Sequence, residues 1–248
     1  MIILKSHAEI EKLRAANLIV CEVMNRLSEK ICAGVATIEL DKIAAELIRK
    51  VNAKPAFLGY RGYSHTLCTS INEEVVHGIP GERTLQNGDI IGIDCGVFYD
   101  GFYGDSAKTF AVGNVSAEAE KLLKVTEEAL YIGIDKARVG NRLFDISEAI
   151  QKHAEASGFS VVRDFVGHGI GTSLHEDPQI PNFGQSGTGI KLREGMVFAL
   201  EPMVNTGDWK VKVLDDKWTV VTMDGSLSAH FEHTMAILKD GPYILSRG

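Results

Sequence analysis

A predicted β-hairpin within residues 85–110 constrains this chain more than any other stretch. Its two apolar runs meet at Asp100-Gly101. An Asp-Gly pair between such runs favours a type I′ turn, in which both central residues take positive φ. With this turn Asp105 faces Gly96, and Asp94 lies on the same face of its own strand. The two carboxylates are then diagonal neighbours, about 7–8 Å apart at Cα.

Two buried carboxylates this close together require a compensating interaction. Ionised Asp94 and Asp105 repel each other when they are buried, and burying even one unpaired carboxylate is costly. A cation bound between them removes both problems. The simpler alternative is a solvent-exposed hairpin face that carries two acids, and other parts of the sequence must decide between the two.

The composition is that of an ordinary globular chain and excludes several functions. Its 248 residues can bury a sizeable core, and a net charge of −7 without a basic run argues against a nucleic-acid or membrane-surface partner. Four cysteines without C-x-x-C spacing are expected to be reduced thiols. No stretch reaches transmembrane length and the first residues lack a signal-peptide core, so we expect a cytoplasmic protein.

The first half is predicted to begin with two helices. Ser6 and Glu9 form a capping-box pattern at the start of the first helix, which Gly34 ends. Thr37 is expected to cap the second helix, which continues to about Val51. The hairpin follows after an irregular stretch.

The second half repeats this order of elements. Residues 116–137, which begin with a capping serine, and residues 144–157 are predicted helices. Residues 196–238 are strand-like, whereas residues 55–81 and 167–189 are rich in glycine and are predicted to be irregular. Two helices followed by strands therefore occur twice.

Two anchors at nearly equal spacing support an internal repeat. Residues 85–94 and 192–201 share a leucine, a glycine, an apolar run and a terminal acid at an offset of 107 residues. Residues 34–40 correspond to residues 140–146 at an offset of 106. Each match alone is weak, but their agreement to within one residue is hard to assign to chance.

The predicted repeat brings four acids together. It makes Glu201 the counterpart of Asp94, and Glu232 follows on a return strand as Asp105 does in the first half. Facing each other about a pseudo-twofold axis, the halves would place four carboxylates in one site, which requires more than one divalent ion. His168 lies between glycines; alone it fits a structural residue in a tight loop, but beside four acids we expect it to be a ligand.

The stretches around these residues resemble a known family. They are residues 70–80 (SINEEVVHGIP), 101–105 (GFYGD), 167–171 (GHGIG), 201–202 (EP) and 232–234 (EHT). Over nearly its whole length the chain resembles the type I methionine aminopeptidases of peptidase family M24. The resemblance implies an α/β (α+β) pita-bread fold, with two pseudo-twofold-related halves of two helices and antiparallel strands forming a curved mixed sheet around the metal site. We predict a single catalytic domain over residues 1–248, with repeats at about residues 6–110 and 116–238.

The same resemblance implies a reaction. The chain would be a hydrolase that releases the N-terminal methionine of nascent proteins and peptides, with a preference for a small second residue. Asp94 would bind one metal ion, His168 and Glu201 the other, and Asp105 and Glu232 would bridge the two. A metal-bound hydroxide would attack the carbonyl after methionine, and Glu201 would also transfer protons.

Two further histidines and a pocket complete the expected site. His175 matches the histidine that hydrogen-bonds the scissile peptide, and His77 matches one that contacts the substrate beyond the cleaved bond. Loop packing is the alternative role for His77. The methionine pocket should be apolar, and the residues that match its wall in the family are Tyr60, Tyr63, Cys68, Phe165 and Trp218. For Trp218 a plain core position is the alternative.

The cofactors and partners follow from the resemblance as well. Two divalent ions are expected, and ligands rich in oxygen with one imidazole suit Co, Mn, Fe, Zn or Ni without selecting among them. The expected partners are the N-termini of nascent polypeptides, and transient ribosome contact is left open. The chain is expected to act as a monomer, without nucleic acid or a membrane.

Two other functions remain as alternatives at this point. The nearer one is an Xaa-Pro peptidase of the same fold, although those enzymes carry a large N-terminal domain that this sequence lacks. The more distant one is a non-catalytic binding module built on the fold. Such modules lose metal ligands, whereas all five predicted positions are intact here.

Overall fold

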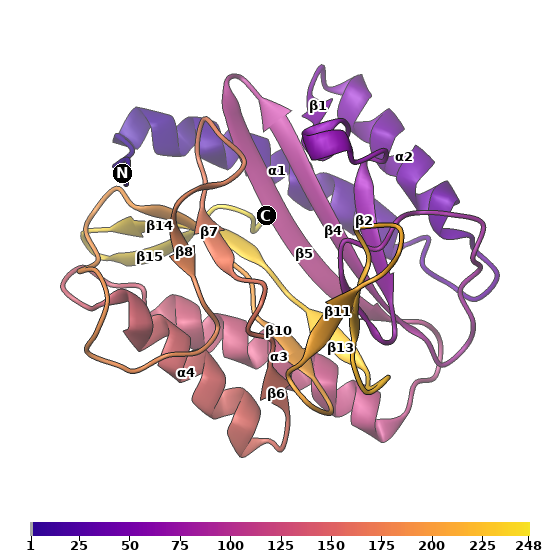
Figure 1. Cartoon of the computed structure of the whole chain (residues 1–248). Coiled ribbons are helices and arrows are strands. Elements are labelled where there is room, and N and C mark those ends of the chain that lie inside the picture. Colours follow the sequence, from indigo (N-terminus) through magenta and orange to yellow (C-terminus); the bar gives the residue numbers. More distant parts are fainter. Residues whose placement is uncertain (1) are drawn as a thin grey trace.

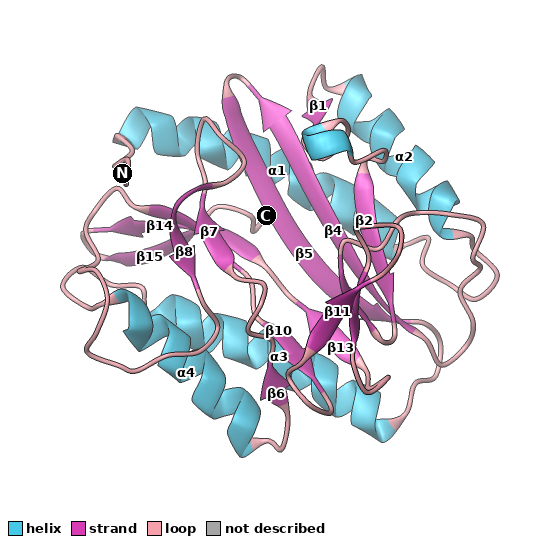
Figure 2. Ribbon diagram, in the orientation of Figure 1, coloured by secondary structure: helices cyan, strands magenta, loops and turns pink. Residues whose placement is uncertain are grey.

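The computed structural model describes residues 2–248 as an α/β molecule in which helices pack against antiparallel sheets (Figures 1 and 2). The helices are α1 (His7–Ser28), α2 (Thr37–Lys50), α3 (Ala117–Lys136) and α4 (Leu143–Ala156), with one 3₁₀ turn at Tyr60–Gly62. The strands are β1 (Lys54–Pro55), β2 (Leu67–Ile71), β3 (Glu74–Val76), β4 (Ile90–Tyr99), β5 (Phe102–Ala111), β6 (Ser160–Val161), β7 (Gly167–Gly169), β8 (Glu176–Ile180), β9 (Val197–Leu200), β10 (Met203–Asn205), β11 (Val211–Val213), β12 (Val220–Thr222), β13 (Ser228–His230), β14 (His233–Leu238) and β15 (Gly241–Ile244). Among the described residues, no helix has both the length and the apolar character needed to cross a bilayer.

The predicted caps of α1 and α3 are confirmed. Ser6 accepts a hydrogen bond from the Glu9 backbone N–H, and the Glu9 carboxylate accepts one from the Ser6 N–H at 2.8 Å. Ser116 accepts from the Ala119 N–H at 3.1 Å at the start of α3. α1 is shorter than predicted: it ends at Ser28, and Gly34 lies in the connection to α2.

The predicted cap of α2 is wrong. Ala36 occupies the cap position, and its N–H donates to the Glu39 carboxylate at 3.3 Å. Thr37 is the first helical residue, and its hydroxyl donates to the Gly81 carbonyl at 3.0 Å. A long-range contact with the loop after β3 therefore takes the hydroxyl that the local pattern assigned to the helix end.

The predicted hairpin and its register are confirmed. β4 and β5 pair over their whole length, with Gly96 opposite Asp105 and Asp94 two residues before Gly96. Asp100 and Gly101 have φ values of 46° and 85°, as a type I′ turn requires. β4 and β5 are the longest strands among the described residues, and the hairpin crosses the centre of the molecule in Figure 1.

This hairpin belongs to one of four sheets, and all of their paired strands are antiparallel, whereas a mixed sheet was predicted. β5 extends the order β1-β4-β2, and the largest sheet has the order β15-β14-β9-β7-β8. The smaller sheets have the orders β13-β10-β6 and β11-β12-β3. Hydrogen bonds join β5 to residues 232–234 at the start of β14: Ser106 Oγ donates to the Glu232 carbonyl at 2.7 Å, and Thr234 Oγ1 donates to the Asp105 carbonyl at 2.8 Å.

Each pair of helices covers its own part of the sheet structure. α1 and α2 lie behind the β4–β5 hairpin, and α3 and α4 cover the second half (Figure 1). Buried side chains of α1 and α2 pack with β2 and β4, whereas those of α3 and α4 pack with β9 and β14. Cys95 lies in the first of these cores, so it points away from the face that carries Asp94, as strand alternation predicts.

Matching details recur in the two halves. Gly34 and Gly140 both have a φ of 95°. Gly34 donates to the Leu85 carbonyl at 2.8 Å, and Gly140 donates to the Leu192 carbonyl at 3.2 Å. These paired features support the internal repeat, which we retain as a proposal together with the single catalytic domain.

The two stretches predicted to be irregular contain strands. β2 and β3 lie within residues 55–81, and β7 and β8 lie within residues 167–189. β2 is buried at every position and β7 is Gly-His-Gly, so neither shows the polar–apolar alternation of a half-buried strand. The missing alternation explains why the sequence pattern did not predict them.

Candidate metal centre

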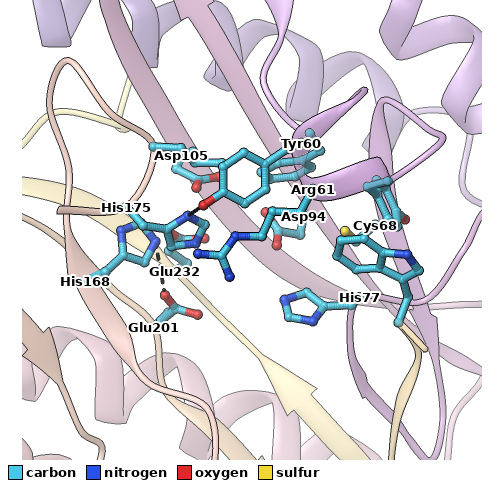
Figure 3. Close-up of a pocket in the computed structure, with 14 residues that line it drawn as sticks. Tyr60, Arg61, Cys68, His77, Asp94, Asp105, His168, His175, Glu201 and Glu232 are labelled. Atoms are coloured by element: carbon cyan, nitrogen blue, oxygen red, sulfur yellow. Dashed lines mark hydrogen bonds and ion pairs between the residues drawn. The ribbon is translucent and has the colours of Figure 1, made fainter. Parts of the chain in front are cut away.

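The five predicted ligands line one cavity of about 160 Å³. They come from separate elements: β4 carries Asp94, β5 carries Asp105, β7 carries His168, and Glu201 and Glu232 follow β9 and β13. Figure 3 shows their side chains converging from both halves of the molecule. The structure therefore brings together all five residues that the sequence singled out.

Three of these side chains form the buried centre of the cluster. One ligand atom from each of Asp105, His168 and Glu232 lies within 4.8 Å of the other two. Glu201 Oε1 lies 3.5 Å from His168 Nε2, at the edge of this group. The spacing suits metal coordination, because ligand atoms bound to one ion at about 2.0–2.2 Å lie within about 4.4 Å of each other.

The carboxylates have the electrostatic character of a cation site. Within residues 2–248, one buried oxygen of each of Asp94, Asp105 and Glu232 has no hydrogen-bond donor. Burial raises the pKa of Asp94 to about 7, and burial also raises the pKa values of Asp105, Glu201 and Glu232. Orphaned buried anions are costly unless a cation compensates them, so these residues fit divalent metal ions.

His168 is held as a neutral imidazole. Its Nδ1 lies 2.8 Å from the Gly169 carbonyl, which leaves Nε2 directed toward Glu201. Burial lowers the pKa of His168 to about 3. A Cβ atom on Gly169 would lie 2.2 Å from the Asp177 carbonyl oxygen, so glycine is required for the close packing of β7 against β8.

One residue near the centre has no role in the sequence prediction. His230 is buried, and its Nε2 lies 3.5 Å from Glu201 Oε2 without a hydrogen bond among the described residues. The segment that contains Glu232 is part of the predicted site, but no local pattern separates His230 from a packed histidine. Its strand position two residues before Glu232 is the signal that could have suggested it.

His77 faces the cavity from a strained loop. It has a φ of 61°, in the left-handed region that non-glycine residues rarely adopt. The next residue holds it there: the Gly78 N–H donates to Ser70 Oγ at 3.2 Å, and the Gly78 carbonyl accepts from Thr69 N–H at 2.8 Å and Tyr63 Oη at 3.0 Å. Burial lowers the pKa of His77 to about 4.

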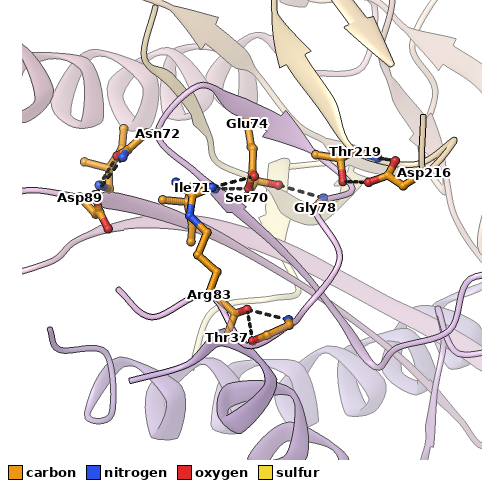
Figure 4. A network of polar contacts seen from close by, with 12 residues as sticks. Thr37, Ser70, Ile71, Asn72, Glu74, Gly78, Arg83, Asp89, Asp216 and Thr219 are labelled. Carbon is orange, nitrogen blue, oxygen red and sulfur yellow. Dashed lines mark hydrogen bonds and ion pairs between the residues drawn. The ribbon is translucent and has the colours of Figure 1, made fainter. Parts of the chain in front are cut away.

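A polar network anchors this loop on both sides (Figure 4). Glu74 accepts from the Ile71 N–H at 2.7 Å and from Arg83 Nη1 at 3.0 Å. Beyond His77, the Gly81 N–H donates to Thr37 Oγ1 at 2.8 Å. The positive φ of His77 is therefore fixed by its surroundings.

His175 faces His77 across the cavity and is tied to the other half of the chain. Tyr60 Oη lies 2.9 Å from His175 Nδ1, and the His175 ring lies 4.3 Å from that of His168 (Figure 3). Burial lowers the pKa of His175, and the Arg61 cation lowers it further. The imidazole is therefore neutral, and its second nitrogen is available to a ligand.

The apolar wall contains most of the predicted pocket residues. Tyr60, Tyr63, Cys68 and Trp218 line the cavity, and the Tyr63 and Trp218 rings pack edge to face at 5.0 Å. Trp218 is therefore a cavity residue. Phe165 does not line the cavity; it packs against the His77 ring at 5.5 Å. Leu174 also lines the cavity, as do Phe57 and Arg61, which the sequence prediction did not include.

Comparison with solved structures establishes the fold class. The prolidase of Pyrococcus horikoshii superposes with a TM-score of 0.81 at 22% identity, over 99% of this chain and 63% of that one. At this identity the likeness concerns the fold alone. The predicted pita-bread α/β architecture is confirmed.

Other comparisons establish the family. A methionine aminopeptidase of Clostridium perfringens is 58% identical over 246 residues, which cover 99% of both chains. The structure of a methionine aminopeptidase from Thermotoga maritima superposes with a TM-score of 0.98 at 46% identity and covers both chains completely. The model of metallopeptidase family M24 matches residues 11–239. The chain therefore belongs to metallopeptidase family M24 and is related over its full length to the methionine aminopeptidases.

Proposed function

We propose that this chain is a metal-dependent aminopeptidase that removes the N-terminal methionine from nascent proteins and peptides, with a preference for a small second residue. The names of its full-length relatives support this activity. The observation that carries it is the cluster of five predicted ligands, in which three buried carboxylates each have an oxygen without a donor among residues 2–248. An apolar pocket lies beside the cluster.

The proposed cofactor is a pair of divalent ions. Asp94 would hold one, His168 and Glu201 the other, and Asp105 and Glu232 would bridge them. Bound there, such ions polarise the scissile carbonyl and activate water. Ligands of this composition accept Co, Mn, Fe, Zn or Ni.

Glu201 is the proposed proton-transfer group. Its side chain lies at the edge of the cluster, between His168 and His230, each with a nitrogen 3.5 Å from one of its oxygens. Asn182 Nδ2 donates to the Glu201 backbone carbonyl at 3.0 Å and fixes the start of the side chain. A carboxylate whose pKa is raised by burial is suited to accept a proton and to return it to the leaving amine.

His175 is the proposed donor to the reacting carbonyl. With Tyr60 Oη donating to Nδ1, the neutral imidazole carries its proton on Nε2, where it can stabilise the developing oxyanion. His77, on the opposite wall, would contact the substrate beyond the cleaved bond. Both histidines are neutral because their pKa values are lowered, so neither adds a positive charge beside the metal ions.

The side chain of methionine would occupy the apolar wall. Tyr63, Cys68 and Trp218 offer aromatic and sulfur contacts that suit a thioether. Phe57 and Leu174 also line the cavity and add to its apolar wall. An apolar wall supports the selection of an uncharged, apolar side chain.

The remaining parts of the proposal concern the setting of the reaction. A cytoplasmic location is supported by four cysteines that are all free thiols. The partners would be the N-termini of nascent polypeptides, met by a monomer, with transient ribosome contact compatible with this role.

The decisive experiment is methionine release from Met-Ala-Ser by metal-free protein to which each of the five metals is returned in turn. We expect release with at least one of them, and its loss in Asp94→Asn and Glu232→Gln. An unchanged unfolding temperature in metal-free protein would separate lost chemistry from lost folding.

The alternatives predict other outcomes. An Xaa-Pro peptidase would cleave Xaa-Pro peptides and leave Met-Ala-Ser intact. A non-catalytic module would cleave neither with any metal. Either result would overturn the proposed activity.

A further inference from the structure

One buried ion pair stands apart from the other pairs of a lysine or arginine with a carboxylate in the described residues. The Lys5 ammonium contacts the Glu176 carboxylate, and the two side chains are only 5% and 8% exposed. In every other pair of a lysine or arginine with a carboxylate within residues 2–248, the cation is at least 48% exposed. The position of this pair therefore needs an explanation.

Stability alone does not supply that explanation. Two charges lose their hydration on burial, and their attraction roughly offsets this cost. Apolar residues of similar volume in place of such a pair are often neutral or stabilising. What a buried pair does supply is a fixed relative position of the two segments that carry it.

The carboxylate partner belongs to the loop that carries His175. Glu176 directly follows His175, and its Oε1 accepts from the Ser173 N–H at 3.2 Å. A Cβ on Gly171 would lie 2.4 Å from Glu176 Oε1 and 2.6 Å from Lys5 Cε, so the loop folds tightly over the ion pair. The Gly171 carbonyl accepts from the Tyr103 N–H of β5 at 2.9 Å, two residues before Asp105.

The lysine partner is itself fixed by backbone contacts. The Lys5 N–H donates to the Gly195 carbonyl at 2.7 Å, and Lys5 Nζ donates to the Ile3 carbonyl at 3.2 Å. A Cβ on Gly195 would lie 2.8 Å from the Lys5 carbonyl oxygen, so the segment before α1 lies tightly on this turn. Gly195 lies just before β9, which leads to Glu201. In Figure 1 the N-terminus lies on the same side of the molecule as β14, the strand that pairs with β9.

We propose that Lys5 and Glu176 are positioning residues for His175: the buried pair fixes the residue 171–176 loop so that the imidazole meets the reacting carbonyl. This inference rests on the proposed role of His175. Neither residue lines the metal cavity, so neither would touch the reacting atoms. A displacement of about 1 Å in a group of this kind can reduce the rate by about 100-fold.

The test is a double variant that keeps the site neutral, Lys5→Met/Glu176→Leu. We expect its unfolding temperature and its affinity for Mn²⁺ to match those of the parent, because apolar replacement of a buried pair is nearly neutral. We expect its kcat on Met-Ala-Ser to fall about tenfold or more, with KM little changed. The matched control is Glu22→Gln, which breaks an exposed pair with Arg26 and should leave both constants unchanged. Full activity in a folded double variant would overturn the proposal.

A second measurement separates this inference from the proposed function. In a His175→Ala background, the double variant should reduce kcat by less than about twofold further, since its effect passes through His175. If the double variant reduced kcat by the same factor with and without His175, the ion pair would act on some other residue, and the inference would be overturned. An active parent with an unaffected His175→Ala variant would instead refute the role of His175. If the double variant fails to fold, Glu176→Gln, which keeps the shape of the side chain, is measured in the parent and in His175→Ala. A loss of kcat in the parent alone supports the inference, and an equal loss in both overturns it.

Discussion

Asp105 lies directly opposite Gly96 in the β4–β5 ladder, and Asp94 precedes Gly96 by two residues on the same face. The two carboxylates are therefore diagonal neighbours whose burial raises the pKa values of both. This relationship depends on the register that the turn at Asp100-Gly101 sets. A slip of one residue would send the two side chains to opposite faces of the sheet.

The turn between β4 and β5 should be destabilised when its glycine gains a side chain. Gly101 has a φ of 85°, so Gly101→Ala places Cβ in the left-handed region and should lower the free energy of unfolding by about 1 kcal/mol. Urea unfolding of metal-free protein measures this change. Gly81→Ala is the control, since a Cβ there meets only the Ile79 carbonyl oxygen at 4.0 Å. Equal losses in the two variants would contradict a strained turn.

Metal binding should stabilise the parent protein and not a variant with one carboxylate fewer. Asp105→Asn removes one of the buried charges that repel each other, so the metal-free variant should unfold at or above the parent temperature. Mn²⁺ at about 100 times its dissociation constant should add about 2.7 kcal/mol to the parent. Calorimetric scans with and without Mn²⁺ measure both effects. An equal gain in Asp105→Asn would rule out its place between the ions.

Two tyrosine hydroxyls should have different effects. Tyr60→Phe removes the contact with His175 Nδ1 and should reduce kcat about fivefold, the equivalent of about 1 kcal/mol, without changing the unfolding temperature. Tyr63→Phe removes the hydroxyl that donates to the buried Leu67 and Gly78 carbonyls and should lower stability by about 1 kcal/mol. Steady-state kinetics and thermal unfolding of both variants test this contrast. A stability loss in Tyr60→Phe would contradict it.

The turn at Asp224 should respond to acid. Hydrogen bonds from Ser226 and from the Asp208 N–H lower the pKa of the Asp224 carboxyl to about 2, so the folded state releases this proton more readily than the unfolded state. Its stabilisation is complete above about pH 4 and is lost as the pH falls toward 2. The difference in unfolding free energy between the parent and Asp224→Ala should therefore be largest near neutral pH and shrink below pH 4. A difference that is independent of pH would contradict this.

The features that were predictable from sequence are those that short segments determine. The type I′ turn and its register follow from Asp100-Gly101, and the caps at Ser6 and Ser116 follow from local hydrogen-bonding patterns. Thr37 shows the limit of such patterns, since its hydroxyl bonds to Gly81 from a distant loop. A contact of this kind depends on the fold, so no local sequence pattern predicts it.

The same reasoning separates the predicted from the unpredicted site residues. Acids at the ends of apolar runs are conspicuous, so the carboxylates could be placed by the repeat. Arg61 and His230 are ordinary residues in their own segments. Only the fold brings Arg61 to the cavity, where it lowers the pKa of His175, and places His230 beside Glu201. Residues of this type can be assigned to the site only from the folded structure.

The hydrogen bonds between β5 and the segment around Glu232 determine how the metal centre can move. The Ser106 and Thr234 hydroxyls each donate to the backbone carbonyl of a proposed metal ligand in the opposite half, and the Glu232 N–H donates to the Ala107 carbonyl at 2.8 Å. The two halves therefore cannot open about the metal centre without breaking these buried bonds. Because these bonds hold the two halves together, we expect the site to discriminate among chain ends by the fit of a preformed cavity.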